Sequence, residues 1–304
     1  QVIACGRIAL MRNLREIDPV TFTSAKLVSY YHMGRGLSIA LMGMVPDRRH
    51  PIDSYMGYVV FKNGLPVAYA GSWILFDSAR IGLNIFPEYR GGESAFIFQQ
   101  VLNLHKEVYG LKRFTVDPYQ LGKDNADGIH SGAFWVYYHA GFRPINSIQK
   151  QLAESEAKKI QDNPGYRTAA ADLKILADSR MEWVMNKNAV WFDATDCSRT
   201  YSNIIREQFN NNRRKAETYG LKKLSDWLQI KNYKDEQLNF VLKNWCVLLF
   251  NKEMQLPQNA LTKKVLKSLF ALKAGGTEEG FIRLMQDFTE LREYMEMVVK
   301  KNHL

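Results

Sequence analysis

The residues best suited to chemistry stand in a glycine-containing loop, Arg90-Gly91-Gly92-Glu93-Ser94-Ala95. An apolar run over residues 79–86 precedes this loop, and an amphipathic segment over residues 94–109 follows it. Adjacent glycines let backbone N–H groups approach a ligand, and the first turn of a helix presents unpaired N–H groups and a positive dipole end. Arg90 adds a fixed positive charge with five donors. The loop predicts an anion site, most naturally for phosphate; a tight turn whose glycines only relieve strain is the alternative.

The segments before this loop are typical of β-structure. Residues 58–61 and 67–75 are β-rich, and the Asn63-Gly64 dipeptide between them is the strongest short-range signal of a β-hairpin. The run over residues 79–86 stops at Pro87 and predicts a third strand.

The segments after the loop alternate between helix and strand. Apolar residues at helical spacing predict a helix over residues 94–109, with Gly110 as its C-cap. A short strand over residues 113–116 and a second helix over residues 131–140, with Ser131 as its N-cap, follow. The first half of the chain therefore predicts an α/β fold.

This pattern over residues 55–144 resembles the GNAT superfamily of acyl-CoA N-acyltransferases. In that family a hairpin leads into a strand that splays from its neighbour. The next loop carries Arg/Gln-x-x-Gly-x-Gly/Ala, whose amides hold the pyrophosphate of acyl-CoA. Arg90 and Ala95 fit the first and last positions, whereas Glu93 stands where a glycine is usual. A carboxylate beside a pyrophosphate is repulsive unless it turns outward or meets a cation.

A second family motif places an alanine, a tyrosine four residues later, and Gly-Phe four residues after that. Ala133, Tyr137 and Gly141-Phe142 match this spacing. His130 replaces the asparagine that usually precedes the alanine by three residues, and Asn125, in a long preceding loop, is the candidate for its displaced equivalent. The resemblance implies that Tyr137 lies near the CoA sulfur; a core aromatic residue with a satisfied hydroxyl is the alternative.

The resemblance implies a mixed, mainly antiparallel sheet flanked by helices, and transfer of an acyl group, most often acetyl, from CoA to an amine. A backbone N–H near residues 83–85 is expected to stabilise the oxyanion, and Tyr137 to act as general acid towards the thiolate. The residues expected to bind acetyl-CoA or another acyl-CoA are Leu83, Asn84, Ile85, Arg90, Gly91, Gly92, Glu93, Ser94, Ala95 and Asn125.

The general base has no clear motif. Asp117 is the first candidate because it follows the predicted strand beside the cleft. Further candidates without a positioning motif are Glu88, His32, His130 and His139. Some family members use only a chain of waters, so the absence of a clear base does not exclude the reaction.

The composition limits the structural class of the protein but does not identify its ligand. The 304 residues are 46% hydrophobic and 24% charged, which excludes collagen-like and wholly disordered chains. The net charge of 41 − 31 = +10 is evenly spread and favours polyanionic partners without selecting one. Three widely spaced cysteines predict reduced thiols in a cytoplasmic protein and no zinc site, and no apolar run is long enough to span a membrane.

The second half of the chain predicts helices. Segments with helical character cover residues 151–161, 168–186, 235–250, 261–273 and 278–300. We therefore expect two domains, a GNAT-like domain over residues 1–150 and an all-α domain over residues 151–304. Basic residues between 206 and 223 alternate with aromatic ones, a pattern of single-strand RNA binders, but a solvated face is the simpler interpretation.

Two other functions stay open at this point. The departure at Glu93 favours a non-catalytic module that keeps the fold and senses acyl-CoA or no longer binds it. The basic helical half favours a transferase that takes its acyl group from aminoacyl-tRNA. The acceptor, the acyl length, the oligomeric state and what precedes Gln1 stay undetermined.

Overall fold

Asn63-Gly64 closes the hairpin at the centre of the sheet. In the computed structural model, which describes residues 1–185, 192–230 and 235–302, β3 (Ser54–Lys62) pairs antiparallel with β4 (Leu65–Leu75). Both turn residues have positive φ, 49° for Asn63 and 83° for Gly64. Such a turn matches the right-handed twist of the strands, and the predicted hairpin is confirmed.

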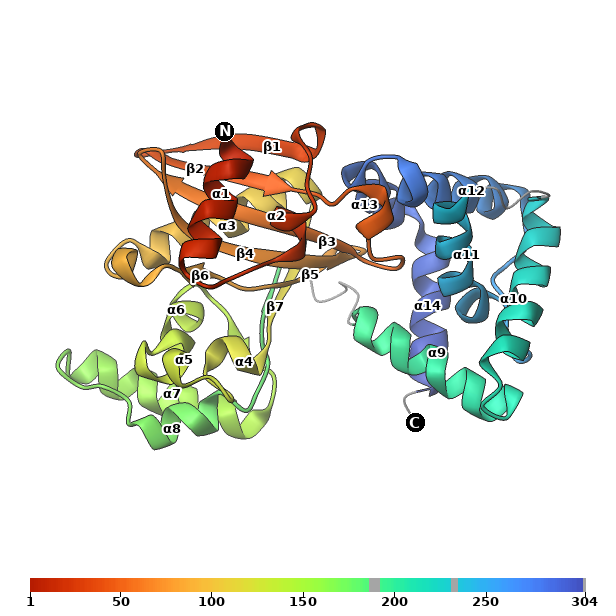
Figure 1. Cartoon of the computed structure of the whole chain (residues 1–304). Coiled ribbons are helices and arrows are strands. Elements are labelled where there is room, and N and C mark those ends of the chain that lie inside the picture. Colours follow the sequence, from red (N-terminus) through yellow and green to blue (C-terminus); the bar gives the residue numbers. More distant parts are fainter. Residues whose placement is uncertain (186–191, 231–234, 303–304) are drawn as a thin grey trace.

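The hairpin belongs to a nine-stranded sheet with the order β1-β2-β3-β4-β5-β7-β9-β8, in which β6 pairs with β4 (Figure 1). Every pair is antiparallel except β5 with β7. The mainly antiparallel α/β architecture is thus confirmed, while its assignment to the GNAT superfamily stays a prediction. The remaining strands are β1 (Val28–Gly34), β2 (Leu37–Met42), β5 (Ser78–Ile81), β6 (Asn84–Ile85), β7 (Arg113–Val116), β8 (Arg143–Pro144) and β9 (Met181–Val184).

The third predicted strand is interrupted at Gly82-Leu83. Its first part, β5, pairs with β4 on one side and with β7 on the other, as far as the Arg80–Thr115 pair. Its second part, β6, pairs with β4 alone. The sheet therefore opens between β6 and the chain that follows β7, and the site described below lies at this opening.

Helices cover both faces of the sheet (Figure 1). Leu10 of α1 (Val2–Arg12) shares a core with Val59 and Phe61 of β3, whereas α3 (Ser94–Tyr109) packs on the alternate residues of that strand. Gly110, at φ 65°, ends α3 as predicted. Short 3-10 turns cover Ala25–Leu27, Pro46–Arg48 and Pro87–Tyr89, and the other helices here are α2 (Asp18–Thr21), α4 (Pro118–Leu121), α5 (Ala126–His130) and α6 (Ala133–His139).

Two details of the predicted elements are wrong. Helix α6 has Gly132, in the left-handed region at φ 64°, as its N-cap in place of Ser131. The expected helix over residues 168–186 is α8 (Ala170–Leu176) followed by β9, and residue 186 lies outside the described residues. Pairing with β7 and β8 holds residues 181–184 extended, so tertiary context overrides the local pattern.

The helical part of the chain starts later than residue 151 suggests, because β9 is a strand of the sheet. The division into two domains stays a prediction. Phe288 separates the last two helices where one was expected, over residues 278–300. Besides α8, the described helices of this half are α7 (Ser147–Asp162), α9 (Ala194–Phe209), α10 (Arg213–Leu228), α11 (Glu236–Leu249), α12 (Ala260–Gly275), α13 (Glu278–Asp287) and α14 (Thr289–Asn302).

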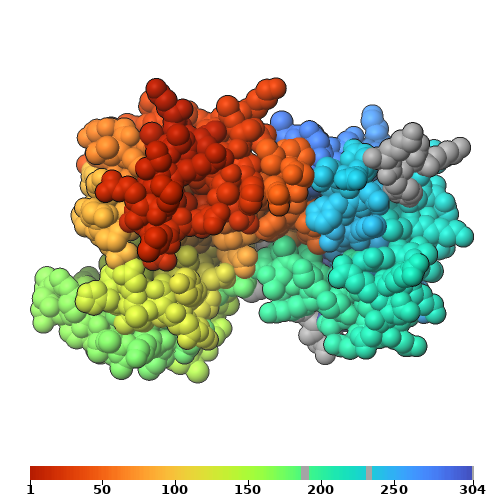
Figure 2. All heavy atoms as spheres, in the orientation of Figure 1, coloured from red at the N-terminus to blue at the C-terminus, as the bar shows by residue number. Residues whose placement is uncertain are grey.

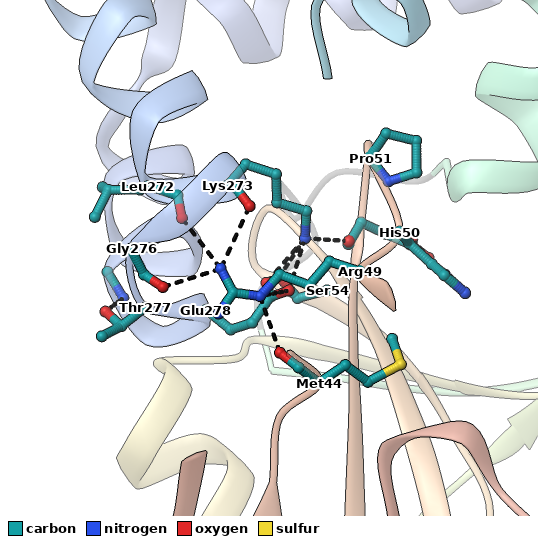
Figure 3. Close-up of polar contacts among 12 residues, drawn as sticks. Met44, Arg49, His50, Pro51, Ser54, Leu272, Lys273, Gly276, Thr277 and Glu278 are labelled. Carbon is teal, nitrogen blue, oxygen red and sulfur yellow. Dashed lines mark hydrogen bonds and ion pairs between the residues drawn. The ribbon is translucent and has the colours of Figure 1, made fainter. Parts of the chain in front are cut away.

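A buried polar cluster ties the helices to the sheet (Figure 3). The Lys273 ammonium at the end of α12 donates to both carboxylate oxygens of Glu278, at 2.8 and 3.0 Å, and to the carbonyl of Asp53, at 2.7 Å. Arg49 Nη1 donates to the carbonyls of Lys273 and Gly276 near the end of α12. The contacts of Arg49 and of the Asp53 carbonyl with α12 join residues more than two hundred positions apart and fix α12 and α13 against the start of β3.

Candidate functional site

A pocket of about 300 Å³ occupies the opening between β6 and the segment after β7. Its predicted lining residues are Leu83, Asn84, Ile85, Arg90, Gly91, Ser94, Asn125 and Tyr137. Its other lining residues, which were not among the predicted binding residues, are Gln120, Asp127, Gly128, Ser131, Ala133 and Val136. We call it the β6 pocket. Gly92, Glu93, Ala95 and Asp117 do not line it.

The backbone of β6 turns polar groups towards this pocket. The Phe86 N–H donates to the Val67 carbonyl of β4 at 3.0 Å. Because backbone groups alternate along an antiparallel pair, the N–H and C=O of Ile85 point away from β4. Two contacts agree with this direction: the Ile85 carbonyl accepts from Arg90 Nε at 3.2 Å, and the Leu83 N–H donates to the Tyr137 hydroxyl at 3.2 Å.

Tyr137 is held firmly beside Leu83. Its ring packs edge-on against Phe98 of α3, with the centroids 5.0 Å apart, and only 3% of the residue is exposed. Its hydroxyl donates to Gln120 Oε1 at 3.4 Å. Burial raises the pKa of the Tyr137 phenol well above its ordinary value, and the Leu83 N–H opposes this only in part. The hydroxyl therefore keeps its proton at neutral pH, as a proton donor must.

The glycine loop closes one end of the pocket. Gly91 has φ 151°, where side chains are rarely tolerated, and a Cβ on Gly91 or Gly92 would meet no atom within 4 Å. The Ser94 hydroxyl donates to the Gly91 carbonyl at 2.8 Å, which fixes the start of α3. The loop thus has room beside its backbone, as an anion site requires.

Glu93 turns away from the pocket. Its carboxylate accepts from Lys62 Nζ at 2.9 Å, and Arg35 lies 3.8 Å away. The hydrogen bond from Lys62 lowers the pKa of Glu93. The Glu93 carboxylate would therefore not repel a pyrophosphate at the loop strongly, because it faces outward and is paired with a cation.

Arg90 is bound to an unpredicted partner. Its guanidinium makes two parallel hydrogen bonds to the Asp127 carboxylate, at 2.8 and 2.7 Å. This pairing raises the pKa of Arg90 and lowers that of Asp127. Asn125 caps α5 by accepting from the Gly128 N–H at 3.3 Å. A phosphate at the loop would compete with Asp127 for Arg90.

The candidate bases lie outside the β6 pocket. Asp117 lines a second pocket of about 440 Å³ and pairs with Arg80 at 3.3 Å and Arg180 at 3.4 Å. The second pocket, which we call the Asp117 pocket, shares Asn84, Gln120, Asn125 and Asp127 with the first. It runs between the loop after α1 and the segment after β7, whose red and yellow atoms meet on the face shown in Figure 2. None of Glu88, His32, His130 and His139 lines either pocket.

The described part of the chain was also searched for metal sites and for membrane-spanning helices. No three or more His, Cys, Asp or Glu residues there are grouped to hold a metal ion. Within the same residues, none of the helices combines the length and the apolar character needed to cross a bilayer. Cys5 is exposed, Cys197 and Cys246 are buried, and all three are free thiols.

Comparison with known proteins adds little. No protein-family model matches the chain, and no curated protein matches it. Among solved structures it is similar to a spermidine N-acetyltransferase from Vibrio cholerae, determined in complex with CoA and spermine, at 16% identity and a TM-score of 0.24. The similarity covers 30% of this chain and spans about half, 53%, of that protein. A similarity this low carries no argument about function.

Proposed function

We propose that this chain transfers an acyl group from acyl-CoA to an amine. The observation that carries the proposal is the opening of the sheet at Gly82-Leu83, with a buried tyrosine on one side and a glycine loop at its end. An extended thioester arm would lie along β6 with its phosphates at residues 90–94. The site's polar backbone and its proton donor would then flank the reacting carbonyl.

Each step of the transfer has a candidate group. The amine nitrogen forms a bond to the thioester carbonyl carbon, and the oxyanion that develops takes a hydrogen bond from the Ile85 N–H. The C–S bond then breaks, and the Tyr137 hydroxyl gives its proton to the departing thiolate. The proton lost by the amine passes to water in the adjoining Asp117 pocket, and water returns a proton to the Tyr137 oxygen. Gln120 would keep the Tyr137 hydroxyl in position, because the two share a hydrogen bond.

Calorimetric titration with acetyl-CoA tests the proposal. We expect micromolar binding that is lost in Arg90→Ala, because that change removes the cation at the loop and leaves Asp127 unpaired. Arg206→Ala is the matched control, since Arg206 is an exposed residue of α9 that does not line the pocket. Absence of acetyl-CoA binding to the wild-type protein would refute the proposal.

A second candidate is a module that binds acyl-CoA without transferring its acyl group. It is favoured by the lining of the β6 pocket, which includes no histidine and whose Asp127 carboxylate is already paired with Arg90. Measuring the release of CoA from acetyl-CoA in the presence of amines distinguishes the two functions. Binding without release over a broad amine panel would support the second candidate.

A further inference from the structure

Two tyrosine hydroxyls open to the Asp117 pocket. Tyr55 and Tyr69 both line it, and they are only 7% and 6% exposed. Neither phenol hydroxyl forms a hydrogen bond with another described residue. Neither hydroxyl is among the described buried polar atoms that lack a partner, so both are open to the pocket and can donate to a bound molecule with hydrogen-bond acceptors.

One cationic side chain that lines this pocket also lacks a partner among the described residues. Arg15, which is exposed, forms neither an ion pair nor a hydrogen bond through its side chain with the described residues. Arg15 and Tyr69 both line this pocket, and the charge of Arg15 opposes the rise that burial causes in the pKa of Tyr69. The pocket therefore has two lining donors, Arg15 and Tyr69, that are available to a bound acceptor.

The carboxylates of the pocket, by contrast, are mostly neutralised. Asp117 is paired with Arg80 and Arg180, and Asp127 with Arg90. Glu16 accepts from the Thr21 hydroxyl at 3.0 Å and is exposed at the rim. Among the carboxylates that line the pocket, a bound polycation could pair only with Glu16 without displacing another cation. The charge of Arg15 would repel that polycation.

We propose that the Asp117 pocket binds the acceptor as a small primary amine that also carries an oxyanion, either a carboxylate or a phosphate. This inference rests on the proposed function. The oxyanion accepts hydrogen bonds from Arg15 and Tyr69, and the amine lies towards Asn84 and Gln120, which line both pockets. A volume of about 440 Å³ suits a small metabolite.

Matched amines test the oxyanion requirement directly. The probes are the twenty L-amino acids beside their C-terminal amides, O-phosphoethanolamine beside ethanolamine, and spermidine. Binding is measured by ligand-observed NMR without CoA, and acetylation by thiol release from acetyl-CoA. We expect at least one oxyanion-bearing amine to bind at least tenfold more tightly than its neutral counterpart, and the carboxylate and phosphate arms to identify which anion is preferred. Spermidine should neither bind nor release thiol.

Substitutions in the pocket test which residues bind the oxyanion of the amine. Arg15→Ala should weaken binding of the preferred amine at least tenfold, and Tyr69→Phe should weaken it severalfold. Arg12→Ala is the control, because Arg12 is an exposed residue nearby in sequence that does not line this pocket. Arg15→Ala should leave acetyl-CoA binding unchanged, which a general loss of structure would not.

The outcomes separate this inference from the proposed function. If acetyl-CoA fails to bind, the proposed function falls, and the inference about the acceptor falls with it. If acetyl-CoA binds but no oxyanion-bearing amine does, or if the amides, ethanolamine or spermidine are used equally well, only the acceptor inference is overturned. An unchanged affinity in Arg15→Ala would likewise overturn it.

Discussion

Replacing Glu278 by glutamine should destabilise the protein severely. The Glu278 carboxylate contacts Lys273 at 2.8 Å and lies 3.5 Å from Arg49, and it accepts from the Ser54 hydroxyl. The side chains of Lys273, Arg49 and Glu278 are 0%, 2% and 4% exposed. Glutamine keeps the shape of the side chain but removes the only negative charge that contacts both cations in the described structure.

The expected loss follows from leaving two cations buried without their carboxylate. Breaking a buried ion pair by removing one partner costs about 3–5 kcal/mol, against a total stability of about 5–15 kcal/mol for a folded protein. Burial already lowers the pKa values of Lys273 and Arg49, and the charge of Glu278 opposes this. Without Glu278, Lys273 is expected to lose its proton on folding.

Urea unfolding followed by circular dichroism measures the effect. Glu279→Gln is the control, because the neighbouring carboxylate is 50% exposed and pairs with Arg283, which is 59% exposed. Such pairs contribute about 0–1 kcal/mol. A loss in Glu278→Gln no larger than in Glu279→Gln would refute the reasoning. Adding Lys273→Met to Glu278→Gln should restore part of the stability, since it removes one unpaired cation.

Two further predictions concern His105 and Tyr137. Burial lowers the pKa of His105 to about 4, and its ring donates through Nδ1 to the Val101 carbonyl at 2.8 Å and accepts from the Ser72 hydroxyl at 3.0 Å. Above pH 6.5 the ring is neutral in both states. As pH falls from 6.5 to 4, only the unfolded chain takes up the proton, so stability should fall by about 3 kcal/mol. Urea midpoints should show this component missing in His105→Gln; a pH dependence equal to that of the wild type would contradict it. Tyr137→Phe should lower the rate of thiol release by about 10²–10⁴-fold with acetyl-CoA affinity nearly unchanged, and a fall in affinity alone would assign Tyr137 a packing role.

Local chemistry made part of the fold predictable. The β3–β4 turn follows from Asn63-Gly64, because both residues accept positive φ. Helix α3 follows from its apolar spacing and from Gly110, whose left-handed conformation ends it. These features depend on residues close together in the sequence, which a sequence pattern records.

Long-range pairing accounts for what the sequence did not predict. The interruption at Gly82-Leu83 arises because β5 pairs with β7 and β6 does not. Strand β9 is extended because β7 and β8 lie on either side of it. The outward direction of Glu93 depends on Lys62, thirty-one positions earlier. In each case the local sequence at the affected position does not indicate which distant residue or strand will pair with it.

The same distinction applies to the candidate site. Arg90 of the loop motif and the candidate base Asp117 are the charged residues that the sequence indicated, yet both are already engaged in ion pairs. Tyr55, Tyr69 and Arg15 belong to no motif, and their side chains form no hydrogen bond or ion pair with another described residue. Recognition of a ligand depends on groups whose hydrogen bonds are unmade before binding. For the acceptor, therefore, the unpartnered donors of the Asp117 pocket are stronger guides than the charges of Arg90 and Asp117.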